Sequence, residues 1–147
     1  MRNLIPCICC LLVTACGAPQ GSPEDALQEW VARGEAAVEK KDRQALLGMI
    51  SDAYADARGN NRKDIGDLLG IYFRRLGSFG LFTDIGDIMI TGDTAAMIDL
   101  TVGMAGTGDS ATGLSADAYS FEFELQKSGD EWLLIGARWG ELGRILH

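Results

Sequence analysis

The side chains best suited to acid–base chemistry in this sequence are Tyr54, Asp56 and Asp99. A carboxylate held among apolar groups has its pKa raised towards a range that is useful for proton transfer, and a tyrosine hydroxyl can polarise a carbonyl. Structural roles remain open for the same residues. Asp56 comes just before a Gly-Asn-Asn stretch, where carboxylates commonly cap backbone NH groups. Asp99 alternates with Ile98 and Leu100, which places it on the opposite strand face.

No pattern in the sequence indicates a metal or a cofactor. With His147 as the only histidine, we expect no histidine-based triad or dyad. All four cysteines lie within the first 16 residues, which argues against a zinc site further along the chain. Asp84, Asp87 and Asp93 lack the glycine and glutamate positions of an EF-hand loop. We therefore expect neither a metal nor a cofactor.

Cys16 indicates a covalent modification. Arg2 precedes an apolar run from Leu4 to Val13, about half as long as a membrane-spanning helix, which is typical of a removable signal peptide. The run leads into Val-Thr-Ala-Cys, which resembles the lipobox of bacterial lipoproteins. In that family the chain is cut before the cysteine, and the new amino terminus is lipidated. Ordinary signal cleavage at the same bond and an uncleaved apolar tail are the alternatives.

Lipidation of Cys16 is the alternative that cysteine usage favours. Cleavage would remove Cys7, Cys9 and Cys10, and a lone exposed thiol is a liability in an oxidising compartment. The chain then divides into a signal peptide over 1–15, a lipidated cysteine with a short linker over 16–21, and one domain over 22–147. The residue after the cysteine, a glycine, resembles the pattern sorted to the outer membrane. We expect the domain to be tethered at the periplasmic face of that membrane.

The charge of the chain limits its partners. The formal net charge of −8 repels phosphate backbones and anionic headgroups, so we expect no nucleic-acid binding. Attachment to the membrane is expected to depend on the lipid anchor and not on a basic patch.

Three helices and four strands must position the candidate residues. Ser22 and Pro23 begin a helix, Asp42 caps a second helix whose apolar spacing continues to Tyr54, and Asn60 or Asn61 opens a third. After these helices the hydrophobic period changes from 3.6 to 2. Strands are predicted over 81–90, 96–104, 119–126 and 132–139, with a loop over 106–115. This order predicts an α+β fold with helices packed on one face of an antiparallel sheet.

The order of elements also resembles the NTF2-like superfamily, which includes SnoaL and ketosteroid isomerase. The resemblance covers roughly residues 23–141 and rests on Tyr54-Ala55-Asp56, the alternation over Phe121–Leu125, and the ending Arg138-Trp139. It implies three helices on a curved four-stranded sheet, forming a cone with an apolar pocket. Ketosteroid-isomerase-type members use a Tyr and Asp arrangement for catalysis. The expected ligand-binding side chains are Tyr72, Phe73, Phe121 and Trp139.

The sequence favours a non-enzymatic module that binds a small apolar ligand or a protein partner near the membrane. The alternative is an isomerase- or dehydratase-type enzyme that uses Tyr54 with Asp56 or Asp99 in the pocket. A third possibility is a homodimer formed through the sheet. The side chains that would supply its interface area are Phe121, Phe123 and Trp132.

Overall fold

The computed structural model describes residues 21–107 and 114–147. Three helices come first, α1 (Pro23–Glu39), α2 (Arg43–Gly48) and α3 (Arg62–Arg75). Four strands follow, β1 (Phe79–Thr91), β2 (Ala95–Thr107), β3 (Leu114–Ser128) and β4 (Glu131–Glu141). The predicted α+β fold is confirmed. The predicted signal peptide, Cys16 and most of the linker lie outside the described residues, as does most of the predicted 106–115 loop.

Side chains at the helix starts explain where two of the helices begin. The Ser22 hydroxyl accepts a hydrogen bond from the Asp25 backbone N–H at 3.1 Å, and the Asp25 carboxylate accepts one from the Ser22 N–H at 2.8 Å. Asn61 forms the same reciprocal cap with Asp64 at the start of α3. None of the three described helices has the length and apolar character of a membrane span.

Helix α2 is shorter than the sequence predicted. It ends at Gly48, and the Arg62 guanidinium binds the carbonyl oxygens of Leu47 and Ile50 that would otherwise continue the helix. The chain then follows the outer edge of β4, where the Ser51 N–H donates to the Leu134 carbonyl at 2.9 Å. Tyr54 therefore lies outside the helix, at the end of a turn in which its N–H donates to the Ser51 carbonyl at 3.1 Å. Pairing with the free edge of β4 satisfies backbone groups that a longer helix would have used.

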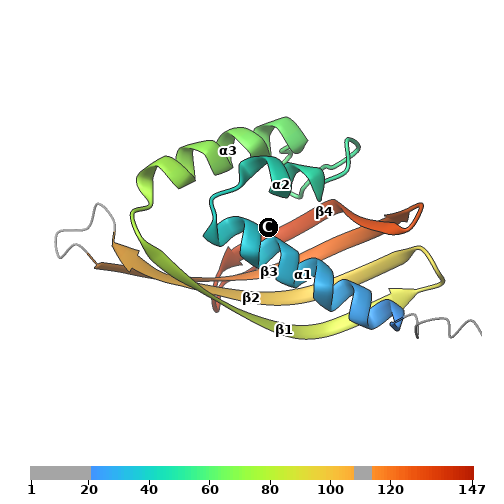
Figure 1. The fold of residues 1–147 in the computed structure, drawn as a ribbon. Coiled ribbons are helices and arrows are strands. Elements are labelled where there is room, and N and C mark those ends of the chain that lie inside the picture. The colour runs from blue at the N-terminus through green and yellow to red at the C-terminus, as the bar shows by residue number, and fades with distance from the viewer. Residues whose placement is uncertain (1–20, 108–113) are drawn as a thin grey trace, which may run out of the picture.

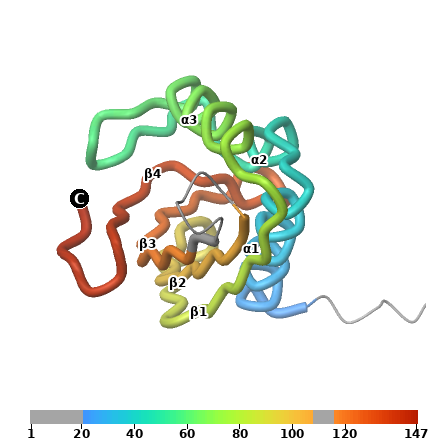
Figure 2. Tube along the Cα trace, turned by 90° about the vertical axis from the view of Figure 1, so that its left-hand side faces the viewer, coloured from blue at the N-terminus to red at the C-terminus, as the bar shows by residue number. Residues whose placement is uncertain are grey.

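The four strands form one antiparallel sheet in the order β1-β2-β3-β4. Bulges between Ile85 and Ile88 and between Glu124 and Leu125 interrupt the register. Bulges bend strands, and the sheet curves around the helices (Figure 1). All three helices lie on one side of it (Figure 2). We call the face towards the helices the inner face and the opposite one the outer face.

The packed core lies between α1 and the inner face. Leu27 and Ile98 are fully buried, and Trp30, Leu125 and Leu134 are buried with them. Burying each large apolar side chain contributes about 1.5–3 kcal/mol to stability. This core fixes α1 on the sheet and leaves the rest of the inner face to α3.

Candidate functional site

The inner face of β3 and β4 carries a continuous group of aromatic side chains. Phe121 and Trp139 are cross-strand partners with nearly parallel rings, whose centroids lie 6.3 Å apart. Tyr119 lies 6.4 Å from each of them. Phe123 lies 5.2 Å from Phe121 and contacts Trp30 of α1 edge-on at 5.9 Å. These rings form an apolar wall that begins in the packed core.

The inner face becomes more accessible towards the end of β2. Ile98 and Leu100 are buried, whereas Val102 and Met104 are only half-buried. Tyr72, on α3 above this end, is 36% exposed. Figure 2 views the molecule from this end. We call the residues gathered here the mouth cluster: Tyr72, Met104, Asp117, Tyr119 and Glu141.

Strand register brings the four strand residues of the mouth cluster together on the inner face of the sheet. Met104 pairs with Asp117, and Tyr119 pairs with Glu141. The Tyr72 hydroxyl reaches across from α3 and lies 3.6 Å from the Met104 sulfur. Because side chains alternate along a strand, Asp117 and Tyr119 share the inner face with Phe121.

Both tyrosines of the mouth cluster have a pKa above the ordinary value for tyrosine. Burial raises the pKa of Tyr72, and Tyr119 and Asp117 raise it further. Burial also raises the pKa of Tyr119, with added effects from the charges of Asp117 and Glu141. Both hydroxyls are therefore hydrogen-bond donors at neutral pH. A thioether sulfur is a weak acceptor, so the Tyr72 proton is available to a stronger one.

Tyr54 and Asp56 are brought together, but in a structural arrangement. The Asp56 carboxylate accepts hydrogen bonds from the backbone N–H groups of Arg58 and Asn60, from the Asn60 side chain, and from the Tyr54 hydroxyl at 3.4 Å. Burial, followed by the charge of Asp56, raises the pKa of Tyr54. With these four donors around it, the carboxylate closes the turn before α3, as a turn-capping Asp would.

Asp99 does not join the other two predicted catalytic residues. It is exposed on the outer face, where it pairs with Glu122, whose carboxylate binds the Arg138 guanidinium. The alternation with Ile98 and Leu100 determines this direction, because those two residues fill the core. Tyr54, Asp56 and Asp99 therefore do not converge on one site.

The predicted ligand-binding residues lie mainly along the aromatic wall. Phe121 and Trp139 form its centre, and Tyr72 stands at its accessible end. Phe73 is half-buried on α3. The Arg58 guanidinium lies 3.5 Å from the centre of the Trp139 ring and donates to the Trp139 carbonyl, so this ring is partly covered by the chain itself.

The side chains suggested for a dimer interface lie on the wrong face for that role. Phe121 and Phe123 belong to the aromatic wall, and Trp132 is only 4% exposed. Phe121 and Phe123 do share one face of the sheet, as their alternation in the sequence indicates, but it is the inner face, on which the helices lie. They cannot supply area for contact with a second sheet.

Sequence reasoning missed Asp117, Tyr119 and Glu141. The alternation through Phe121 and Phe123 extends back to Tyr119 and Asp117, so their shared face could have been recognised. Their proximity to Tyr72 depends on how α3 lies over β2, which no local pattern specifies.

Within residues 21–107 and 114–147, no three His, Cys, Asp or Glu side chains gather as a metal site. A hollow of about 380 Å³ between α1, α2 and β4 is lined by Arg33, Lys40, Asp42 and Glu131 among others. Its charged groups are of both signs and exposed, and it lies apart from the aromatic wall.

Several solved structures share this fold. A ketosteroid isomerase-like protein from Erwinia carotovora atroseptica has a TM-score of 0.68 and 13% identity, covering 82% of this chain and 96% of its own. A putative dehydratase of the NTF2-like family from Streptomyces avermitilis has a TM-score of 0.69 and 12% identity, with coverage of 82% and 97%. A putative scytalone dehydratase from Novosphingobium aromaticivorans has a TM-score of 0.69 and 9% identity, with coverage of 84% and 89%. The sequence matches no family model and no curated protein.

The chain therefore has the NTF2-like fold, as the resemblance implied. The preference for a non-enzymatic binding module was wrong. The similar structures are mostly described as enzymes, including dehydratases and a hexachlorocyclohexane dehydrochlorinase, and they favour the enzymatic alternative.

Proposed function

We propose that this protein is an enzyme of isomerase or dehydratase type that moves a proton on a small, largely apolar substrate at the mouth cluster. One observation carries the proposal. Two tyrosine hydroxyls that hold their protons, Tyr72 and Tyr119, stand near the Asp117 carboxylate at the accessible end of an aromatic wall. Asp117 is itself exposed, and the apolar wall begins beside it at Tyr119 and Phe121. A carboxylate next to hydroxyl donors supplies the groups that acid–base chemistry at carbon requires.

In this proposal Asp117 is the general base. The C–H bond next to a substrate carbonyl breaks, its proton passes to the Asp117 carboxylate, and the electron pair moves towards the carbonyl oxygen. Return of that proton to another carbon gives an isomer. Departure of a hydroxide that takes up a proton as it leaves gives a dehydrated product. Proton transfer by a positioned side chain contributes about 10²–10⁴-fold to such rates.

The tyrosine hydroxyls stabilise the charge that develops on the substrate oxygen. The Tyr72 hydroxyl donates to that oxygen in place of the weak sulfur acceptor of Met104, and the Tyr119 hydroxyl donates to it from the neighbouring strand, β3. Removing one donor of this kind costs about 10²–10³-fold in rate. Phe121 and Trp139 provide the apolar surface against which the substrate carbon skeleton lies.

The proposal is tested by deuterium uptake from D2O into the α-carbons of cyclohexanone and 2-tetralone, followed by NMR. The folded protein is expected to accelerate uptake above the buffer rate. The same protein unfolded in urea is expected not to, because surface carboxylates alone do not position a ketone. Uptake at the buffer rate for both ketones would contradict the proposal.

We also propose that Cys16 is lipidated and holds the domain at the periplasmic face of the outer membrane. The apolar run before it, the Val-Thr-Ala-Cys ending and the loss of the other three cysteines on cleavage support this modification. The tether would position the enzyme without taking part in its chemistry.

A further inference from the structure

The hollow of about 380 Å³ opens between α1, α2 and the start of β4, which are labelled in Figure 1. Part of its wall consists of small residues, Ala36 and Ala37 on α1 and Ala45 and Gly48 on α2. A Cβ atom at Gly48 would meet nothing within 4 Å, so the chain leaves space here that a larger residue would fill. Small-molecule sites have volumes of about 300–1,000 Å³, and this hollow is at the lower end of that range.

The outer edge of β4 has no neighbouring strand where it borders this hollow. Further along β4 the chain covers that edge, because the Leu134 N–H donates to the Met49 carbonyl at 2.9 Å. Two residues earlier, Trp132 pairs in register with Lys127 of β3, whose N–H donates away from β4 to the Thr94 carbonyl at 2.8 Å. Lys127 and Trp132 are therefore a pair without mutual hydrogen bonds, and the Trp132 N–H and C=O point away from β3 into the hollow.

The backbone of Trp132 has hydrogen-bonding capacity that the fold does not use. Trp132 is only 4% exposed, and no described residue bonds to its N–H or C=O on the side of the hollow. An unpaired backbone group at a buried residue costs free energy comparable to a lost hydrogen bond, so the great majority of such groups are paired. One donor and one acceptor at a strand edge suit a ligand that has a peptide backbone of its own.

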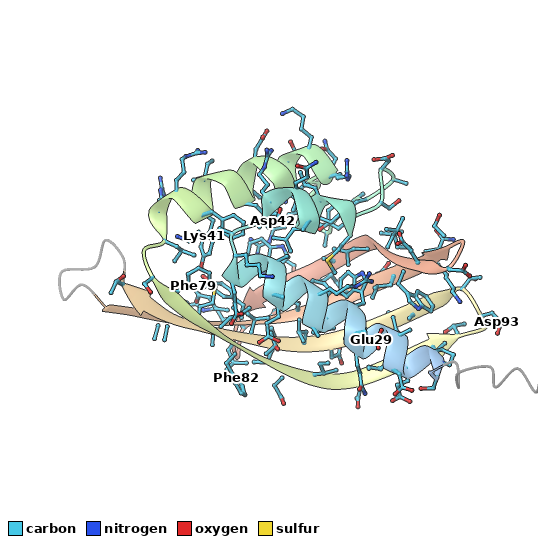
Figure 3. All side chains as sticks on the ribbon, in the orientation of Figure 1. Glu29, Lys41, Asp42, Phe79, Phe82 and Asp93 are labelled. Atoms are coloured by element: carbon cyan, nitrogen blue, oxygen red, sulfur yellow. The ribbon has the colours of Figure 1, made fainter. Side chains whose placement is uncertain are left out.

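The charged residues around the hollow are not neutralised by one another. Arg33 and Lys40 of α1 and Glu131 of β4 form no ion pair with any described residue. Asp42, at the start of α2 (Figure 3), accepts a hydrogen bond from the Ala45 N–H through one carboxylate oxygen, which leaves the other oxygen available. A free short peptide has the matching groups, because it carries an ammonium at one end, a carboxylate at the other and amides between them.

We propose that the hollow binds a free di- or tripeptide, which lies along β4 as one more short strand. The peptide backbone pairs with the N–H and C=O of Trp132. Its carboxylate lies near Arg33 or Lys40 and its ammonium near Glu131 or Asp42, where charge-assisted hydrogen bonds strengthen binding. The walls from α1 and α2 limit the ligand to a short peptide. The hollow shares no residue with the mouth cluster, so this site is independent of the proposed enzyme activity.

The test is an NMR titration of the isotopically labelled full chain with trialanine. The Trp132 backbone amide proton is expected to shift downfield as its hydrogen bond forms. The shifts should saturate with a dissociation constant of about 1 mM or lower. N-acetyl-trialanine amide keeps the peptide backbone but lacks both terminal charges, so it should bind about threefold more weakly or worse. Equal binding of the two peptides would overturn the assignment of a free peptide as the ligand.

Gly48→Leu places a large side chain in the hollow and is expected to raise the dissociation constant for trialanine by about tenfold or more. Gly80→Leu is the matched control, because a Cβ atom there also meets nothing within 4 Å and Gly80 lies on β1, away from the hollow. It should leave the dissociation constant unchanged. Thermal unfolding followed by circular dichroism verifies that both variants are folded.

Two results would overturn the proposal. One is the absence of any shift at the Trp132 amide at millimolar trialanine, and the other is unchanged binding in folded Gly48→Leu. Ketone deuterium exchange takes place at the mouth cluster and should be the same in Gly48→Leu as in the wild type. Failure of the peptide site is therefore distinguishable from failure of the proposed enzyme activity.

Discussion

The Tyr72 hydroxyl on α3 donates to the Met104 sulfur on β2 over 3.6 Å. This contact spans the accessible end of the inner face, next to Asp117, the register partner of Met104. A thioether is a poor hydrogen-bond acceptor. The contact therefore orients the hydroxyl, and little hydrogen-bond energy is lost when a substrate oxygen replaces the sulfur. Tyr72 is therefore both oriented and available.

Tyr72→Phe should reduce ketone deuterium exchange by about 10²-fold, because the ring remains while the donor to the developing oxyanion is lost. The free energy of unfolding should change little, since only a bond to sulfur disappears. Exchange rates and urea denaturation of the same preparation measure both quantities. An unchanged exchange rate would remove Tyr72 from the proposed mechanism.

Asp56→Ala should destabilise the fold without selectively affecting proton transfer. Asp56 is 8% exposed and accepts four hydrogen bonds, so its loss leaves donors unpaired and should cost about 2–4 kcal/mol. Asp52→Ala is the matched control in the same loop. The Asp52 side chain is 98% exposed, and its ion pair with Arg62 should contribute only about 0–1 kcal/mol. If urea denaturation showed the same loss of unfolding free energy in Asp56→Ala and Asp52→Ala, the structural role of Asp56 would be contradicted.

Tyrosine ionisation should be delayed in the folded protein. All three tyrosines have a pKa above the ordinary value of 10.0, in each case chiefly because of burial. Near-ultraviolet absorbance at pH 10.0 should therefore show less tyrosinate in the folded chain than in the unfolded chain, which is about half ionised.

The same shifts determine how stability depends on pH. The folded state binds the tyrosine protons more tightly, so their contribution to stability is complete below pH 10 and declines above it as the unfolded chain ionises. Tyr54→Phe should reduce this alkaline loss of stability. Tyrosine ionisation in the folded chain at the same pH as in the unfolded chain would show that the hydroxyls are not buried as described.

Lipidation of Cys16 predicts a specific mass. Intact mass spectrometry of the protein from bacterial membranes should give a chain that begins at Cys16 and carries acyl chains. Cys16→Ser should abolish both the added mass and the membrane association. A wild-type chain that begins at residue 16 without added mass would indicate ordinary signal cleavage instead.

Local signals in the sequence were sufficient for the element order. The caps at Ser22 and Asn61 depend on residues three positions away, and the alternation around Phe121 depends on residues two positions away. Interactions over such short separations can be recognised in any sequence. They correctly predicted the α+β order.

Longer-range pairing explains what the sequence did not reveal. Tyr54 has helical spacing from Ile50, but the neighbouring backbone pairs with β4, 80 or more residues away. The mouth cluster likewise depends on the register between β2 and β3 and on the position of α3 above them. Tyr119 and Asp117 were overlooked because only tertiary contacts bring them to Tyr72.

The rate of ketone deuterium exchange in Asp117→Asn tests the proposed function most directly. The substitution keeps the shape of the side chain and removes its ability to take up a proton, so the rate should fall by about 10²–10⁴-fold. Asp93→Asn removes one charge from an exposed turn and serves as the control (Figure 3). We predict exchange near the buffer rate in Asp117→Asn and near the wild-type rate in Asp93→Asn. Equal exchange rates in the two folded variants would contradict the assignment of Asp117 as the base.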